Sequence, residues 1–450
     1  MEETSLLGGL LVFLGLLLLG SVALAARQLS YQAFEFELRL FFVAFVLRFA
    51  MSLMIYQFGL VEVLKDEDAS GWWRGHDLYR AWTAQGLGLF DLPAAMAQAF
   101  DFGVGRNRGY FYMLGGFFYL TGIATRMAAA ALNGFFGALT VVLVYRIARS
   151  LASDWVAVRV GWWSCFFPSL IIWSAQTIKE PVIIFLQTLA LYACVQLKRE
   201  HISPTYIGLC IAAGVLLIPF RFYAAYVVIV AVLVTLLLPR INEGKLTIST
   251  GLILAVLLGG LVSVTGILSL QEAELQRRGY DLRYVEKFRY HASAGRLGTG
   301  SGVKSDFDLE TPTGFVMGAA FGGVHLLLAP FPWQFGGGSV RMMLTAPEMV
   351  VWWWLFFVGV LPGLWYVVRH RWPEVLPLLI FVAGLGLLCS IAFGNIGLAY
   401  RQRAQLLPWL LIFAMVGLEQ RARRRLAAQQ QALAGRQVLP GTVYSTQLRR

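Results

Sequence analysis

Apolar stretches separated by polar loops run along most of the chain. An apolar α-helix needs about 20 residues to cross roughly 30 Å of hydrocarbon, because each residue advances it by about 1.5 Å. The stretches that reach or approach this length are 6–25, 41–62, 127–148, 155–174, 181–197, 205–219, 221–239, 247–269, 348–368, 374–393 and 405–418. This pattern predicts an all-α fold, a polytopic bundle with one transmembrane helix for each stretch.

Two further apolar stretches are harder to place. Residues 110–124 are few for a span, and 313–332 are rich in Gly and Pro. Two long polar segments, 64–109 and 270–312, also interrupt the pattern. We expect both apolar stretches to be re-entrant or interfacial, a conformation tolerated at membrane depth only where protein buries it or where it lines a cavity.

The loop cations then fall mostly on one side of the membrane, which the positive-inside rule assigns to the cytoplasm. These basic segments are 26–40, 146–154, 198–204, 240–246, 369–373 and the tail from Glu419. We therefore expect a transmembrane domain over 1–418, with large outer loops at 64–109 and 270–312, and a basic cytoplasmic tail over 419–450. If 110–124 crossed the membrane, Lys198 and Arg199 would move outside and the charge bias would weaken.

Composition agrees with a membrane protein. Hydrophobic residues make up 58% of the chain and charged residues 14%, against about 25% charged in soluble domains. The net charge of +12 would suggest nucleic acid in a soluble protein; here topology accounts for it, and we expect membrane lipids rather than nucleic acid as partners. The four cysteines lie in apolar stretches, which favours buried thiols over disulfides or zinc ligands.

Three acids stand at the outer end of the second apolar stretch. Asp66, Glu67 and Asp68 precede Trp72 and Trp73. A carboxylate beside aromatic rings at a membrane boundary can bind a sugar and accept a proton, so Asp66 and Glu67 are candidate catalytic residues. Carboxylates also bind hard cations, so Asp68 could hold a divalent cation. The alternative is a hydrated end of a span.

Further outer residues are candidates for binding substrate: Arg106, Arg108, Lys179, Glu180, Arg401 and Arg403. Guanidinium groups can clamp phosphate oxygens with two hydrogen bonds. The alternatives are interfacial snorkelling for the first two arginines, a helix cap for Lys179 and Glu180, and structural ion pairs for the last two arginines.

The conformation of the last segment decides how its two arginines point. On a helix, Arg401 and Arg403 would face different ways, whereas in an extended segment they would share a face. Arg221 is another outer cation, at a helix break after Pro219. Arg48 lies within the second apolar stretch, where it either faces the bundle or snorkels toward the inner side.

Other chemistries lack support in the sequence. The five histidines are scattered without the spacing of metal ligands. A phosphate-cradling P-loop and a serine nucleophile elbow do not occur in the sequence either.

The order of several motifs resembles that of the C-type membrane glycosyltransferases, in particular glycosyltransferase family 39, with the protein O-mannosyltransferases and the lipid A aminoarabinose transferase. The matching segments are Asp66-Glu67 at the start of the first outer loop, Arg126–Arg149, Ser174–Leu191 and Tyr400–Pro408. Where relatives often carry an acid ahead of the proline, this chain has Lys179-Glu180 before Pro181, so the acid is displaced or its role is changed to phosphate binding.

The resemblance implies inverting transfer of a sugar from a polyprenyl-phosphate donor to a glycan, lipid or protein acceptor. The site would face outward from the bacterial inner (plasma) membrane, in biosynthesis of cell-envelope polysaccharide. Asp66 would deprotonate the acceptor, and the cations would stabilise the leaving phosphate. The alternatives are a polysaccharide polymerase or ligase, and a transporter of lipid-linked glycans.

Overall fold

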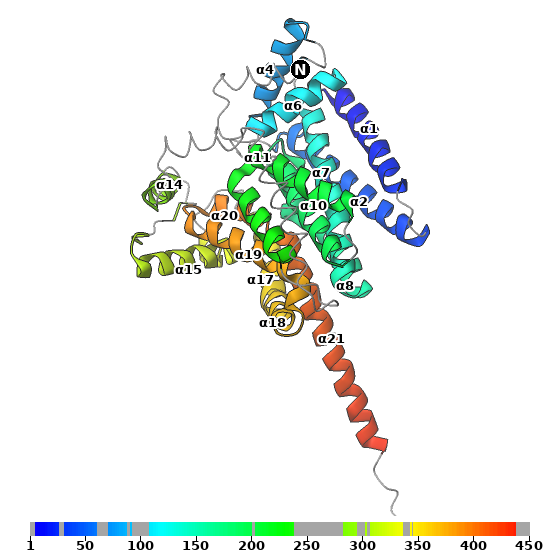
Figure 1. Ribbon diagram of the computed structural model, residues 1–450, viewed down its shortest axis with the longest axis vertical. Coiled ribbons are helices and arrows are strands. Elements are labelled where there is room, and N and C mark those ends of the chain that lie inside the picture. The colour runs from blue at the N-terminus through cyan, green and yellow to red at the C-terminus, as the bar shows by residue number, and fades with distance from the viewer. Residues whose placement is uncertain are drawn as a thin grey trace, which may run out of the picture.

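The computed structural model describes residues 5–26, 31–60, 71–87, 91, 108–199, 203–237, 282–294, 302–303, 307–335, 343 and 345–437. Within these ranges the only strand-like pairing is an isolated bridge between Gly302 and Asn395. The expected all-α architecture is therefore confirmed (Figure 1).

In chain order the helices are α1 (Leu6–Ala25), α2 (Tyr31–Tyr56), α4 (Trp73–Ala84), α6 (Arg108–Thr121), α7 (Arg126–Leu151), α8 (Asp154–Phe166), α9 (Pro168–Ala175), α10 (Glu180–Arg199), α11 (Pro204–Leu237), α14 (Leu282–Ala294), α15 (Pro312–Leu328), η5 (Pro332–Gln334), α17 (Ala346–Leu355), η6 (Phe356–Val360), α18 (Leu361–His370), α19 (Trp372–Ile391), α20 (Ile396–Arg403) and α21 (Leu407–Gln437).

Seven helical segments in the described ranges are long and apolar enough to cross a membrane when α11 is counted as one segment, and the bent pair α8–α9 makes an eighth if it is one span. This establishes a polytopic membrane protein. The predicted stretch 247–269 lies outside the described residues, so the complete number of spans stays a prediction.

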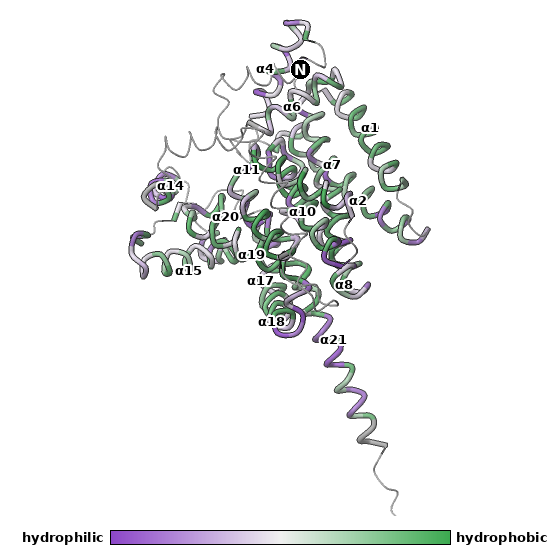
Figure 2. The backbone as a smooth tube through the Cα atoms, in the orientation of Figure 1, coloured by the Kyte–Doolittle hydropathy of each residue, from purple (hydrophilic) through white to green (hydrophobic). Residues whose placement is uncertain are grey.

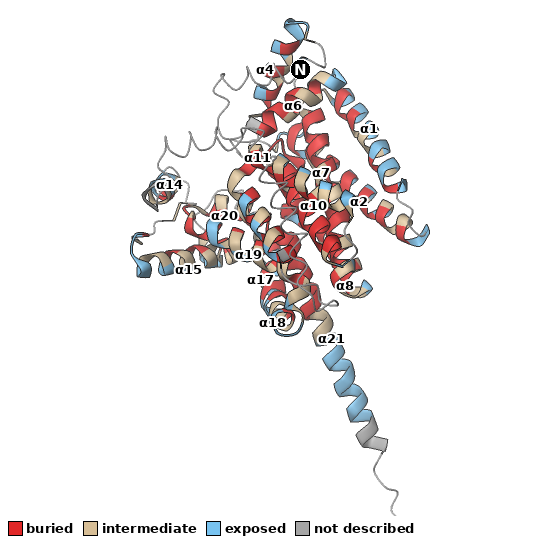
Figure 3. Ribbon diagram, viewed as in Figure 1, coloured by how far each residue is buried: buried red, intermediate tan, exposed pale blue. Residues whose placement is uncertain are grey.

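Helix α7 forms the centre of the bundle. It begins at the cap residue Thr125, whose hydroxyl accepts a hydrogen bond from the amide of Ala128 at 3.1 Å, and most of its residues are buried (Figure 3). Small residues allow close packing here: a Cβ on Gly9 of α1 would lie 2.6 Å from the Cβ of Met127. The side of α1 away from α7 exposes leucines such as Leu7 and Leu18, the apolar surface expected against lipid (Figure 2).

Helix α11 consists of two limbs that run in opposite directions along α10. The first limb packs antiparallel to α10, because Tyr206 near the start of the limb makes an edge-to-face contact with Tyr192 in the second half of α10. At Arg221 the backbone leaves the helical region, with φ −160° and ψ 86°. The second limb runs back along α10. Arg221 at the start of this limb pairs with Glu180, and Thr235 near its end contacts Cys194. The reversal follows Pro219, so the predicted stretches 205–219 and 221–239 correspond to the two limbs.

The two doubtful stretches form short helices at the periphery. Helix α6 has 14 residues and α15 has 17, which gives lengths of about 21 and 26 Å at 1.5 Å per residue. Helix α6 packs beside α4 at the end of the molecule that carries the N-terminus, and α15 projects to one side (Figure 1). Both are shorter than a full span, and their re-entrant placement stays a prediction.

Helix α21 leads from the core into the C-terminal tail. Its first turns are buried among the other helices, while residues 421–433 are exposed (Figure 3). The helix continues without a break through the predicted domain boundary at Glu419. It leaves the bundle at the end opposite α4 (Figure 1). The domain division itself stays a prediction.

Candidate functional site

A non-helical segment between α9 and α10 is held by side chains of two other helices. The Asn133 amide of α7 donates to the carbonyl oxygens of Gln176 and Ile178 at 2.6 and 2.7 Å. From α2, the Tyr56 hydroxyl accepts from the amide of Thr177 at 2.9 Å. These contacts satisfy buried backbone groups that have no helical partner. They fix the position at which α10 starts, and α10 starts at Glu180.

Glu180 lies between two arginines from distant parts of the chain. Its side chain is completely buried, and its Oε1 lies 2.8 Å from Nη2 of Arg221 and 3.2 Å from Nε of Arg401. Arg221 is placed by the reversal of α11, and Arg401 by the short helix α20. The structure thus brings together two of the predicted residues, Glu180 and Arg401, with one cation that the prediction gave no binding role.

Amides extend this cluster toward the core. Gln402 Oε1 accepts from Nη1 of Arg221 at 3.0 Å and from Nε2 of Gln405 at 2.8 Å. Gln187 then donates to Gln405 at 3.0 Å. The network ties α10, α11 and α20 together and restricts the side chain of Arg221 to one orientation.

Among the described residues of the cluster, cations outnumber carboxylates. Two guanidinium groups face one carboxylate, and Lys179 adds a third cation next to it in sequence. Among the described residues, Oε2 of Glu180 is buried without a hydrogen-bond partner. The side chain of Arg401 is 15% exposed, whereas that of Arg221 is 5% exposed. Guanidinium groups held in place by a carboxylate, one of them partly accessible, are suited to bind an anion such as a phosphate.

Arg403 points away from this cluster. Residues 396–403 form a helix, so the two arginines diverge as expected for that conformation. Arg403 is fully buried and donates to the carbonyl oxygens of Leu327 and Ala329 at 3.2 and 2.9 Å. It thereby holds the end of α15. Its predicted contact with substrate stays a prediction.

Next to Arg403, Tyr400 donates a hydrogen bond to Oε2 of Glu348 at 2.7 Å. Burial and the charge of Glu348 raise the pKa of the Tyr400 hydroxyl well above its usual value. Tyr400 therefore stays a neutral hydrogen-bond donor at all ordinary pH values.

The remaining predicted residues cannot be placed in the site. Asp66, Glu67, Asp68 and Arg106 lie outside the described residues. Arg108 is the first residue of α6. Among the residues that the structure describes, no group of three or more His, Cys, Asp or Glu could hold a metal ion. Roles for the three acids therefore stay predictions.

Charged side chains that do not belong to the cluster also lie within the bundle. Glu37 of α2 and Arg146 of α7 form a bidentate pair, with Arg146 Nε 2.9 Å from Oε1. Arg48 is 1% exposed and faces the bundle, where it donates to the carbonyl oxygen of Ala44 at 3.0 Å. The side chain of Arg48 therefore points into the bundle and does not snorkel toward the inner side of the membrane.

Sequence reasoning passed over three residues that build the cluster. The position of Arg221 at a helix break does not by itself predict a binding role. Gln402 lies between Arg401 and Arg403 in the sequence. Asn133 belongs to the segment that resembles the glycosyltransferases. The proline before Arg221 was the usable signal, because a helix break frees a cation to turn inward.

No protein-family model matches the chain, and no curated protein matches it. Among solved structures, it is similar to the Archaeoglobus fulgidus oligosaccharyltransferase, crystallised with a tethered acceptor peptide, at 14% sequence identity and a TM-score of 0.40. The match covers 69% of this chain and 41% of that one, so the chain spans less than half the length of that protein.

Proposed function

We propose that the protein is a membrane glycosyltransferase that moves a sugar from a polyprenyl-phosphate donor to an acceptor at the outer face of the membrane. The observation that carries the proposal is the buried carboxylate of Glu180 between Arg221 and Arg401. The order of the motifs around this cluster resembles that of the C-type membrane glycosyltransferases. This resemblance is the reason for proposing a sugar transfer.

The donor phosphate would bind to Arg401 and Lys179 at the accessible side of the cluster. Glu180 would act as a positioning residue, because it holds both guanidinium groups at fixed places before the donor arrives. Preorganised cations stabilise charge where it develops, without the cost of reorientation during the reaction. Here the charge develops on the phosphate oxygen that leaves.

In the proposed step the acceptor hydroxyl attacks the anomeric carbon of the sugar. The new bond joins that carbon to the acceptor oxygen, and the bond from the carbon to the phosphate oxygen breaks. Asp66 takes the proton of the acceptor hydroxyl, and polyprenyl phosphate leaves with the bonding electrons. A well-placed general base contributes about 10²- to 10⁴-fold to the rate, so Asp66→Asn should lower transfer by that factor.

The test uses the purified full chain in liposomes with a radiolabelled polyprenyl-monophosphate sugar. We expect Arg401→Gln and Arg221→Gln to weaken donor use by about 10- to 100-fold, since a hydrogen bond to a charged group contributes roughly 1.5–3 kcal/mol. The control is Arg146→Gln, which removes the cation of a buried pair elsewhere in the bundle. It should lower stability but keep activity per folded molecule.

Three results would overturn the proposal. The first is unchanged transfer in both cluster variants. The second is use of a polyprenyl-diphosphate oligosaccharide in place of the monophosphate sugar, which would identify a polymerase or ligase. The third is movement of a lipid-linked glycan across the liposome membrane without breakage of a glycosidic bond, which would identify a transporter.

A further inference from the structure

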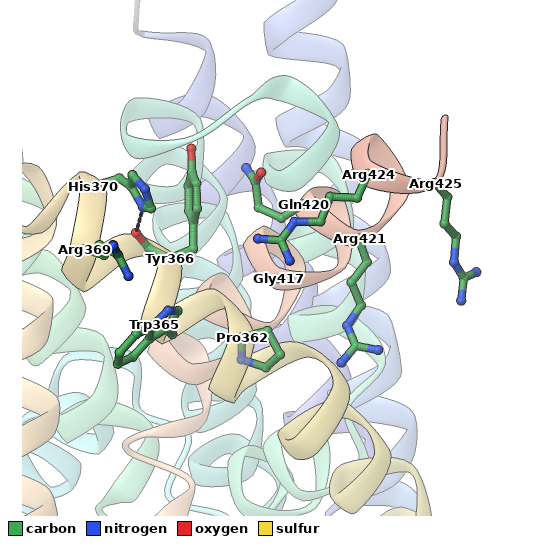
Figure 4. Close-up of a pocket in the computed structure, with 10 residues that line it drawn as sticks. All are labelled: Pro362, Trp365, Tyr366, Arg369, His370, Gly417, Gln420, Arg421, Arg424 and Arg425. Atoms are coloured by element: carbon green, nitrogen blue, oxygen red, sulfur yellow. Dashed lines mark hydrogen bonds between the residues drawn. The ribbon is translucent and has the colours of Figure 1, made fainter. Parts of the chain in front are cut away.

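A second basic site shares no residue with the Glu180 cluster. A pocket of about 730 Å³ opens between α18 and the part of α21 that leaves the bundle (Figure 4). Its volume lies within the range of small-molecule sites, about 300–1,000 Å³. Five of its lining residues are basic: Arg369, His370, Arg421, Arg424 and Arg425.

Glycines determine where the pocket begins. Helices α18 and α21 touch backbone to backbone at Gly363, where an added Cβ would lie 1.8 Å from the carbonyl oxygen of Phe413. Gly417, which lines the pocket, makes the same kind of contact with Gly359. Beyond this crossing both helices carry long basic side chains in place of glycines. These side chains keep the helices apart and surround the space between them.

None of the described residues that line the pocket is acidic. The acids nearest to it along the chain, Glu374 and Glu419, are paired with Arg371 and Arg423. In the described part of the chain, no ion pair involves any of the four lining arginines. Unpaired like charges around one space repel each other, so the pocket favours an anionic occupant.

The position of the pocket indicates the kind of anion. Helix α18 ends a candidate membrane span over Ala346–His370, and its apolar residues Leu361 and Val368 are exposed on the surface that lipid would cover. Trp365 and Tyr366, which also line the pocket, are aromatic residues of the kind found at the level of lipid headgroups. Basic pockets between helices on the cytoplasmic side of a membrane recognise phosphate-bearing lipids.

We propose that this pocket binds the phosphate headgroup of an anionic phospholipid, with its acyl chains along the apolar surface of α18. The arginines of both helices contact the phosphate, and Trp365 packs against the glycerol and upper acyl region. The lipid therefore bridges α18 and α21 below their glycine contact. This site is independent of the glycosyltransferase proposal, since none of its residues belongs to the Glu180 cluster.

The experiment is native mass spectrometry of the delipidated full chain, titrated with dioleoyl phosphatidylglycerol or dioleoyl phosphatidylcholine. We expect one phosphatidylglycerol to remain bound and phosphatidylcholine to dissociate. Arg369→Gln with Arg424→Gln should weaken phosphatidylglycerol binding by about 10-fold or more, because each basic residue near anionic lipid contributes about 1 kcal/mol.

The matched control removes two charges outside the pocket. Arg39 and Arg423 are exposed and each pairs with an acid on its own helix, so Arg39→Gln with Arg423→Gln should leave binding unchanged. A further arm adds inorganic phosphate and glycerol phosphate as competitors. Equal binding of both lipids, an equal effect of the control pair, or full displacement by the water-soluble anions would overturn the proposal, the last by showing a site for a soluble anion.

Discussion

Glu180 balances two positive charges in the interior of the bundle, and this makes it sensitive to substitution. Its replacement by Gln keeps the size of the side chain but leaves Arg221 and Arg401 facing each other. Removal of one partner from a buried ion pair costs about 3–5 kcal/mol. We therefore expect Glu180→Gln to lower the thermal unfolding midpoint in detergent and to abolish donor binding.

A double variant separates the charge effect from lost packing. Glu180→Gln with Arg221→Gln leaves only one unpaired guanidinium, so it should recover part of the stability lost by Glu180→Gln alone. The control is Glu37→Gln, which breaks the other buried pair and should lower stability while donor binding persists. Equal midpoints for the wild type and Glu180→Gln would contradict this account.

The sequence identified individual charged residues better than their partners. Glu180 and Arg401 could be selected because ionisable groups near the membrane are costly and demand an explanation. Their pairing with each other could not be predicted, because they lie 221 residues apart in the chain. Arg403 shows the same limit, since its partners are backbone carbonyls, which carry no signal in the sequence.

At the scale of elements, the start of α10 depends on Asn133. Asn133→Leu keeps a similar volume but leaves the carbonyl oxygens of Gln176 and Ile178 without donors. Each such buried group costs about 1–3 kcal/mol. We expect lower stability and faster hydrogen exchange of the amides around 176–183, measured by mass spectrometry. In the control, Thr140→Val on the same helix removes only a local hydrogen bond to Phe136 and should leave that exchange unchanged.

The contact between α18 and α21 admits no side chain at Gly363. Gly363→Ala would push a methyl group against the Phe413 carbonyl, so we expect a large loss of the folded, monodisperse fraction in gel filtration. Gly15→Ala is the matched control, because nothing lies within 4 Å of that position in α1. Ala favours a helix over Gly by about 1 kcal/mol, so the control should be neutral or slightly stabilising. A well-folded Gly363→Ala protein would contradict the observed packing.

Element boundaries follow from the sequence where a backbone rule applies. Pro219 marks the reversal of α11. Thr125 and Ser153 cap α7 and α8, because their hydroxyl groups accept hydrogen bonds from backbone amides of the first helical turn. The bend between α8 and α9 falls at Pro168, where a 51° change of direction separates two short helices. The packing partners of the short helices α14 and α15 depend on tertiary contacts, and no periodic pattern in the sequence specifies those contacts.

At the scale of the whole molecule, the charge distribution predicts which ends face opposite compartments. The native cysteines are all buried, so a single engineered surface cysteine should dominate the labelling. We expect Arg80→Cys on α4 to react with a membrane-impermeant maleimide in intact cells. Arg425→Cys on α21 should react only after permeabilisation. Both positions are exposed arginines, so the two variants are matched in residue type and accessibility. Labelling of both in intact cells would overturn the predicted orientation.

The unbroken course of α21 also has a practical consequence for imaging. From Glu419 to Gln437 the helix extends for 19 residues, or about 28 Å at 1.5 Å per residue, beyond a base locked by glycine contacts. A rigid helical scaffold protein joined in register after Gln437 would turn with the bundle and stand clear of the detergent micelle. Such a fusion would add mass and asymmetry to a 50 kDa particle, and so help to align particle images in electron cryomicroscopy.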